Sequence, residues 1–106
     1  MIVSNYLFFI FKGILWRGNI GSNCDFPGND LKTVQTNNGN ECDAICKKTS
    51  GCTSFTWNPY FNNSCYIKSK TVIKSNALFL EDWLKAKVFG IVCGVVSKTE
   101  KIIGIY

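Results

Sequence analysis

The residues with the most distinctive chemistry are six cysteines, at positions 24, 42, 46, 52, 65 and 93. Thiols in this number can form disulfides, hold a zinc ion or act as nucleophiles. The chain has no histidine, so imidazole-assisted nucleophiles and imidazole-ligated zinc are excluded. An even cysteine count favours disulfides in an oxidising compartment. A zinc site built from the four central cysteines would leave two over, so we expect disulfides, no metal and no cofactor.

Carboxylates offer the remaining route to catalysis. Asp25 and Asp30 could form an acid and base pair, but aspartates beside Pro-Gly and Asn are typical turn or cap residues. The glycines near Gly18 and Gly21 lack the strand-to-helix spacing of a phosphate-binding loop. We therefore expect that the chain is not an enzyme.

Charge and composition indicate one small globular domain. The 106 residues are 46% hydrophobic and 14% aromatic, which is enough for one modest core. Twelve Lys and Arg against seven Asp and Glu give a net charge of +5. The lysines are dispersed, so the charge favours acidic partners only slightly, and we expect no nucleic-acid binding.

One short helix is predicted from Glu41 to about Ser50. Asn40 is suited to cap its start, acidic residues occupy its positive first turn, and lysines lie near its negative end. Gly51 fits the position just beyond the last turn. An apolar stripe that includes Cys42 and Cys46 predicts that the helix packs on a sheet.

The same two cysteines should not bond to each other. On a helix, Cys42 and Cys46 are four residues apart, with Cβ atoms about 5–6 Å apart, whereas a disulfide needs about 3.5–4.5 Å. Both sulfurs must therefore reach other parts of the chain and staple the helix to the sheet twice.

A hairpin is predicted after the helix. Residues 52–57 alternate, with Phe55 and Trp57 on one face and Cys52 on the other, and an Asn-Pro pair ends the run. Residues 64–69 alternate in the same way after an Asn-Asn turn, so the two runs should pair.

Other segments are less regular. Residues 88–96 are apolar on both faces, which predicts a central strand. Residues 31–36 are too short for an assignment, and residues 71–84 mix strand-forming and helix-forming types.

The first segment, Met1 to Trp16, is apolar and aromatic. It is shorter than the about 20 residues that span a bilayer, and it lacks the basic start and small-residue cleavage site of a clean signal peptide. Three interpretations stay open: a degenerate secretion signal, sequence upstream of the domain, or a first strand that begins only near Trp16. We therefore divide the chain into an N-terminal segment (1–17), a domain (18–96) and a C-terminal tail (97–106), without a transmembrane span.

Five stretches of the chain resemble PAN/apple domains: 23–31 (NCDFPGNDL), 42–46 (CDAIC), 50–57 (SGCTSFTW), 65–69 (CYIKS) and 93–96 (CGVV). The resemblance covers about residues 18–96. It implies an α+β fold, with one short helix packed on a curved, disulfide-stapled antiparallel sheet. It also implies the bridges Cys24–Cys93, Cys42–Cys65 and Cys46–Cys52. The N-terminal stretch and the Lys-rich residues 84–87 depart from the family's pattern at the two ends of the domain.

The resemblance implies a recognition module of secreted or surface proteins that binds proteins or carbohydrates and has no catalysis of its own. Exposed aromatic rings beside amides suit such recognition. They gather around the predicted hairpin, so the candidate ligand-binding residues are Trp57, Asn58, Tyr60, Asn62, Tyr66 and Lys68.

Each candidate has a plainer interpretation. Trp57 is favoured as a core residue. Lys68, Lys70 and Lys74 could line an anionic ligand, but a solvated face is favoured. Asn62-Asn63-Ser64 is a permissive glycosylation sequon.

Two functions remain as hypotheses. The first is an extracellular module, alone or within a larger protein, that recognises a glycan or an extracellular protein. The alternative is a small secreted cysteine-rich protein with a structural or inhibitory action on a partner protein.

Overall fold

The structure is a computed structural model and describes residues 8–80 and 90–97. In this part of the chain, one α-helix and nine strands appear in this order: β1 (Phe8–Phe11), β2 (Ile14–Arg17), β3 (Ile20–Ser22), β4 (Cys24–Asp25), β5 (Asp30–Gln35), α1 (Gly39–Lys48), β6 (Ser54–Asn58), β7 (Ser64–Lys68), the 3-10 turn η2 (Lys74–Asn76), β8 (Leu78–Phe79) and β9 (Val92–Val95).

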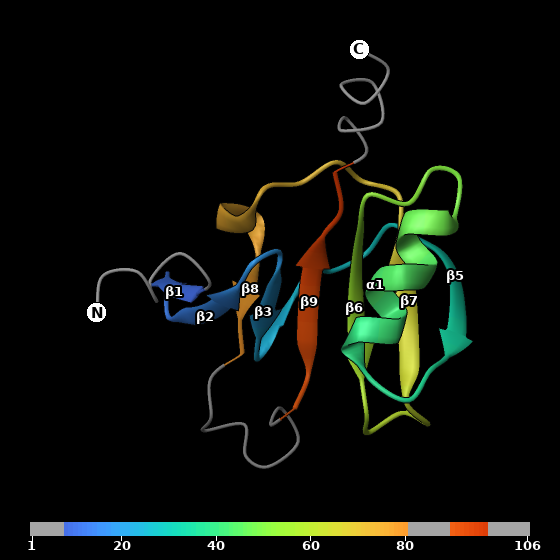
Figure 1. The fold of residues 1–106 in the computed structure, drawn as a ribbon, viewed down its shortest axis with the longest axis horizontal. Helices are drawn as coiled ribbons and strands as arrows, with labels where there is room; N and C mark the ends of the chain where they lie inside the picture. The colour runs from blue at the N-terminus through green and yellow to red at the C-terminus, as the bar shows by residue number, and fades with distance from the viewer. Residues whose placement is uncertain (1–7, 81–89, 98–106) are drawn as a thin grey trace.

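Seven strands form one antiparallel sheet in the order β1-β2-β3-β9-β6-β7-β5, and β4 and β8 form a separate pair. The helix α1 lies over β6, β7 and β9 on one face of the sheet (Figure 1). This architecture confirms the predicted α+β class, with one helix on an antiparallel sheet.

The helix begins two residues earlier than predicted. Its N-cap is Asn38, whose side chain accepts a hydrogen bond from the Glu41 amide at 2.9 Å. The Glu41 carboxylate in turn accepts from the Asn37 amide at 2.8 Å. The expectation that Asn40 caps the helix is wrong, because an asparagine followed by glutamate three residues later satisfies two backbone donors at once.

The first core cluster lies between α1 and the sheet. Cys42 and Cys46 of the helix pack there with Phe55 and Ile67 of the hairpin, and all four are fully buried. Cys52 belongs to the same cluster. The predicted alternation therefore fails at Cys52, because β6 begins only at Ser54 and the preceding turn brings this cysteine to the helix side.

A second cluster lies beside β1, β2 and the β4–β8 pair. Ile14 and Trp16 are fully buried in it, together with Cys24, Cys93 and Phe26. Strand structure begins at Phe8, so the expectation that a first strand begins only near Trp16 is wrong. The apolar β1 gave no alternating pattern, because several of its side chains stay exposed at the edge of the sheet.

The six cysteines form the bridges Cys24–Cys93, Cys42–Cys65 and Cys46–Cys52. These are the pairs that the family resemblance implies. Two of them tie α1 to β7 and to the segment before β6, and the third ties β4 to β9. The helix is therefore fastened to the sheet through both of its buried cysteines.

The other expectations are met in part. The hairpin β6–β7 is confirmed, and β9 is central as predicted, between β3 and β6. Residues 31–36 lie mainly in the edge strand β5, whose mostly exposed side chains explain the weak pattern. Residues 81–84, the Lys-rich residues 84–87 and the start of the predicted strand at residues 88–89 lie outside the described residues, as do residues 1–7 and 98–106. The limits proposed for the domain stay a prediction.

Candidate functional site

The candidate site lies on the face of the sheet opposite α1. Side chains of β6 and β7 alternate, so Phe55 and Ile67 point toward the helix, whereas Thr56, Tyr66 and Lys68 point away from it. The crossing segment, residues 25–30, runs from the end of β4 to the start of β5 over this second face and supplies the other wall of the site.

Hydrogen bonds pin that crossing segment to the sheet. The Thr56 hydroxyl donates to the Asp25 carboxylate at 2.7 Å, and the Phe26 amide donates to the same hydroxyl oxygen at 3.3 Å. The Asn29 carbonyl accepts from the Ser69 amide at 3.0 Å. Because both ends of the segment are held, its Pro27-Gly28 turn has a defined place above the strands.

Lys68 is the central fixed charge of the site. Its side chain is only 5% exposed, and its ammonium donates to the Asp30 carboxylate at 2.6 Å and to the Gly28 carbonyl at 3.1 Å. The Tyr66 ring centroid lies 5.8 Å from the same ammonium. The interpretation of Lys68 as part of a solvated lysine face is therefore wrong, because a carboxylate 38 residues away in sequence and a carbonyl 40 residues away hold it in the interior.

The larger cavity at the site, which we call the acidic hollow, has a volume of about 420 Å³. Two carboxylates, a hydroxyl, an amide and two aromatic rings line it, together with aliphatic side chains and the turn; its lining consists of Asp25, Pro27, Gly28, Asp30, Thr56, Asn58, Phe61, Tyr66, Lys68, Leu80 and Ile91. Its two carboxylates outnumber its one ammonium, so the hollow is rich in hydrogen-bond acceptors.

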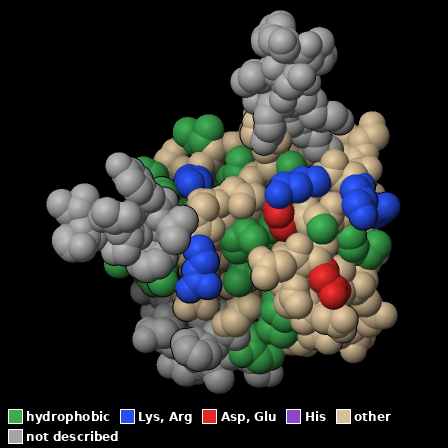
Figure 2. Space-filling view, in the orientation of Figure 1, with side chains coloured by type: hydrophobic (Ala, Val, Ile, Leu, Met, Phe, Trp, Pro, Cys, Tyr) green, Lys and Arg blue, Asp and Glu red, His purple; other side chains and the backbone are tan. Residues whose placement is uncertain are grey.

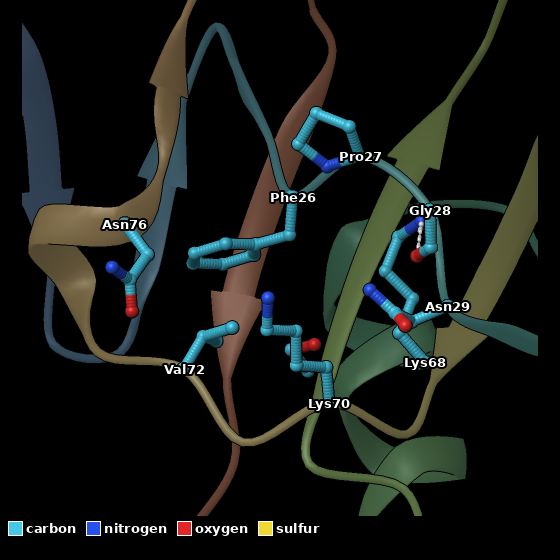
Figure 3. Close-up of a pocket in the computed structure, with 9 residues that line it drawn as sticks. Phe26, Pro27, Gly28, Asn29, Lys68, Lys70, Val72 and Asn76 are labelled. Atoms are coloured by element: carbon cyan, nitrogen blue, oxygen red, sulfur yellow. Dashed lines mark hydrogen bonds between the residues drawn. The ribbon is translucent and has the colours of Figure 1, made fainter.

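A second cavity, which we call the Lys70 pocket, has a volume of about 250 Å³. Figure 3 shows it from the side opposite the helix: Phe26 and Val72 form apolar walls, and the Lys70 side chain extends into the cavity. The two cavities share Pro27, Gly28 and Lys68 in their linings, so they adjoin at the turn.

The structure divides the six predicted ligand-binding residues. Asn58, Tyr66 and Lys68 line the acidic hollow together. Trp57 faces the helix side, where it packs on the first core cluster and donates from Nε1 to the Thr36 carbonyl at 3.3 Å. Tyr60 does not line either cavity, and Asn62 lines a separate shallow cavity of about 290 Å³ beside the start of α1.

The residues that sequence reasoning missed come mainly from the crossing segment. Asp25 and Asp30 were considered only as a catalytic pair or as turn residues, and the structure makes both of them walls of the acidic hollow. Thr56 could have been found, since it shares the predicted strand face with Asn58. No local pattern links Asp25 to a strand about thirty residues later.

The opposite side of the molecule has a different character. On the face that carries α1, Lys, Arg, Asp and Glu side chains are scattered among hydrophobic and other side chains and do not gather in one basic patch (Figure 2). Within residues 8–80 and 90–97, no group of three metal-ligating side chains comes together, and none of the helices in these ranges is long and apolar enough to cross a membrane.

Comparison with known protein families decides the identity of the fold. The family model described as the PAN domain matches residues 20–88, which is more than half of the chain. The chain belongs to the PAN-domain family. PAN domains are general modules for binding proteins or carbohydrates and are typically non-catalytic.

Membership of the family indicates a binding module but does not identify its ligand. The matched region of this PAN domain contains the crossing segment, the helix and the hairpin, and so nearly all of both cavity linings. A disulfide-rich PAN domain is consistent with an extracellular location. The comparisons with curated proteins and with solved structures found no match.

Proposed function

We propose that this PAN domain is a secreted or surface-exposed carbohydrate-binding module and that the acidic hollow is its binding site. The observation that carries the proposal is the convergence of Asp25, Asp30, Asn58 and Tyr66 from three separate segments on one concave surface. The volume of about 420 Å³ lies within the range of about 300–1,000 Å³ typical of ligand sites.

The chemistry of the lining suits a sugar. Sugar hydroxyls are hydrogen-bond donors as well as acceptors, and ionised carboxylates are acceptors only. One oxygen of Asp25 accepts from Thr56, and one oxygen of Asp30 accepts from Lys68. The second oxygen of each carboxylate can accept from a sugar hydroxyl. The rings of Tyr66 and Phe61 supply apolar faces against which the C–H side of a sugar ring can pack.

The same contacts support a binding role rather than a catalytic one. General acid and base catalysis by two carboxylates requires both groups to be placed to exchange protons with a substrate. Here each carboxylate is held by a neighbouring side chain: Asp30 accepts from the Lys68 ammonium at 2.6 Å, and Asp25 accepts from the Thr56 hydroxyl at 2.7 Å. Secretion is supported by the three buried disulfides, since such bridges persist in oxidising compartments.

A glycan array with the oxidised protein tests the proposal, and two tyrosines provide matched variants. Tyr66 lines the hollow, whereas Tyr60 lies in the turn outside it and is 42% exposed. We expect Tyr66→Ala to weaken binding to the selected sugars about tenfold or more, and Tyr60→Ala to leave it unchanged. Equal effects of the two substitutions would contradict the acidic hollow as the site.

The alternative function, a structural or inhibitory protein that acts on a partner protein, gives a different result. It predicts no enrichment on any sugar and a stoichiometric complex with a defined protein in sedimentation experiments. Binding of a sugar that Tyr66→Ala abolishes would count against it.

A further inference from the structure

The Lys70 pocket contains a buried hydroxyl without a partner. Ser54 is 1% exposed, and its Oγ has no hydrogen-bond partner among the described residues. Because Ser54 lines the pocket, a polar atom of a guest molecule is a candidate partner for this hydroxyl. An unpaired buried hydroxyl costs free energy, which a ligand atom that pairs with it would recover.

The pocket also contains an ammonium without a matching carboxylate. Lys68 is balanced by Asp30, but no Asp or Glu side chain lines the pocket into which Lys70 extends (Figure 3). Two amide side chains, Asn29 and Asn76, also line the pocket, and Asn76 Oδ1 accepts from the Ile73 amide at 2.9 Å. The polar side chains of the lining thus include the ammonium of Lys70, the hydroxyl of Ser54 and these two amides, and the unmatched ammonium favours an acceptor of negative charge.

The remaining walls limit the size of that acceptor. Phe26 is buried and Val72 half-buried, and with Pro27 they give the pocket an apolar lining. Its volume of about 250 Å³ falls below the range of about 300–1,000 Å³ for whole ligands. It therefore suits one end group of a larger molecule.

We infer that the Lys70 pocket binds the singly charged oxyanion of an acidic saccharide, a carboxylate or a sulfate ester, while the neutral part of the sugar lies in the acidic hollow. The inference rests on the proposed carbohydrate-binding function. The shared lining of Pro27, Gly28 and Lys68 allows one molecule to reach both cavities. Charge decides which part of the saccharide occupies each cavity: its hydroxyls face the carboxylates of Asp25 and Asp30, and its anion faces Lys70.

Matched sugar pairs test the inference. Methyl glucoside and methyl glucuronide differ only in a hydroxymethyl and a carboxylate group, and so do methyl galactoside and methyl galacturonide; the 6-sulfates form the sulfate arm. Titration calorimetry with the full oxidised chain should show acidic forms binding about tenfold more tightly than neutral forms. The preference should shrink as NaCl is raised from about 50 to 500 mM.

Two variants assign the preference to the pocket. Lys70→Met removes the charge from an exposed residue and should abolish the preference for the acidic forms without weakening the neutral ones. Ser54→Ala should weaken the acidic forms about threefold or more. Lys48→Met removes the same charge from the exposed end of α1 and should change nothing. Thermal unfolding of each variant verifies that the fold is intact.

The outcomes separate the two proposals. Tight binding of neutral and acidic forms alike, or a preference that survives Lys70→Met, overturns the role of the Lys70 pocket and leaves the proposed function standing. Binding of neither form of any pair overturns both. A preference for only the carboxylate or only the sulfate form, lost in Lys70→Met, supports the inference and names the anion.

Discussion

The ring of Phe55 on β6 lies directly against Gly94 on β9. The two residues are cross-strand partners, and a Cβ atom at position 94 would come within 2.3 Å of the Phe55 ring. Phe55 is fully buried in the cluster beneath α1. The absence of a side chain at Gly94 is therefore what allows a phenyl ring to fill the centre of the sheet at this point.

We expect Gly94→Ala to lower the free energy of unfolding by about 1–3 kcal/mol, because the added methyl group overpacks a filled core. Urea unfolding of the oxidised protein measures the loss. In Phe55→Leu, the smaller side chain makes room for the methyl, so Gly94→Ala should cost less in that background. The same cost in both backgrounds would show that the Phe55 ring does not cause the strain.

The helix cap supplies a second prediction with a neighbouring control. Asn38→Ala removes the acceptor of the Glu41 amide and should cost about 0.5–2 kcal/mol of stability. Asn40→Ala lies within the first turn, where its side chain is exposed, and should cost nothing measurable. Hydrogen exchange should quicken at the Glu41 amide in Asn38→Ala alone, and quickening only in Asn40→Ala would restore Asn40 as the cap.

The Lys68–Asp30 pair should behave as an ion pair with a buried cation, since the Lys68 side chain is 5% exposed and that of Asp30 is 45% exposed. Asp30→Ala leaves the buried ammonium with the Gly28 carbonyl and should cost about 1–3 kcal/mol. Lys68→Met in that background should recover part of the loss, because it removes the unpaired charge. Lys47→Ala, which breaks the more exposed pair with Asp43 on α1, should cost only about 0.3–0.5 kcal/mol. Equal losses in Asp30→Ala and Lys47→Ala, measured by urea unfolding, would contradict an interior role for Lys68.

The three disulfides should differ in their contribution to stability. All six cysteines are fully buried, so replacing any pair with alanines leaves similar cavities and the closed loop makes the difference. For separations of 69, 23 and 6 residues, loop entropy predicts losses of about 4.4, 3.4 and 2.2 kcal/mol. Urea midpoints of the three double variants should follow that order, with Cys24–Cys93 the most important. A reversed order would mean that strand packing, and not loop closure, governs their effect.

The sequence predicted those elements whose signals lie within a short stretch of the chain. The hairpin β6–β7 was predicted because alternation and turn residues lie within about fifteen positions of each other. The helix was predicted from its charge pattern and apolar stripe, with Asn40 wrongly taken as its cap. An asparagine followed by glutamate three residues later, Asn38 and Glu41, was present in the sequence to place its start. β1 and β5 escaped because edge strands expose much of their surface and therefore lack a clear alternating pattern.

The residues of the candidate site were likewise predicted where local patterns place them together and missed where they come from distant segments. Asn58, Tyr66 and Lys68 were predicted together because one hairpin carries them. Trp57 was weighed as either core or ligand-binding, and strand alternation turns it toward the helix. The carboxylates of the acidic hollow were not predicted as binding residues, because they come from a segment about thirty to forty residues away along the chain.

The six cysteines, the absence of histidine and the alternating hairpin were enough to determine a disulfide-stapled α+β scaffold without imidazole chemistry. Those features depend on residue type and on short-range periodicity, which a sequence displays directly. Only the tertiary structure decided that the Pro27-Gly28 turn crosses the back of the sheet, that Lys68 is buried against Asp30, and that Ser54 and Lys70 share a cavity. Such contacts depend on how segments far apart in the sequence pack against each other, and local side-chain patterns do not specify which distant segments meet.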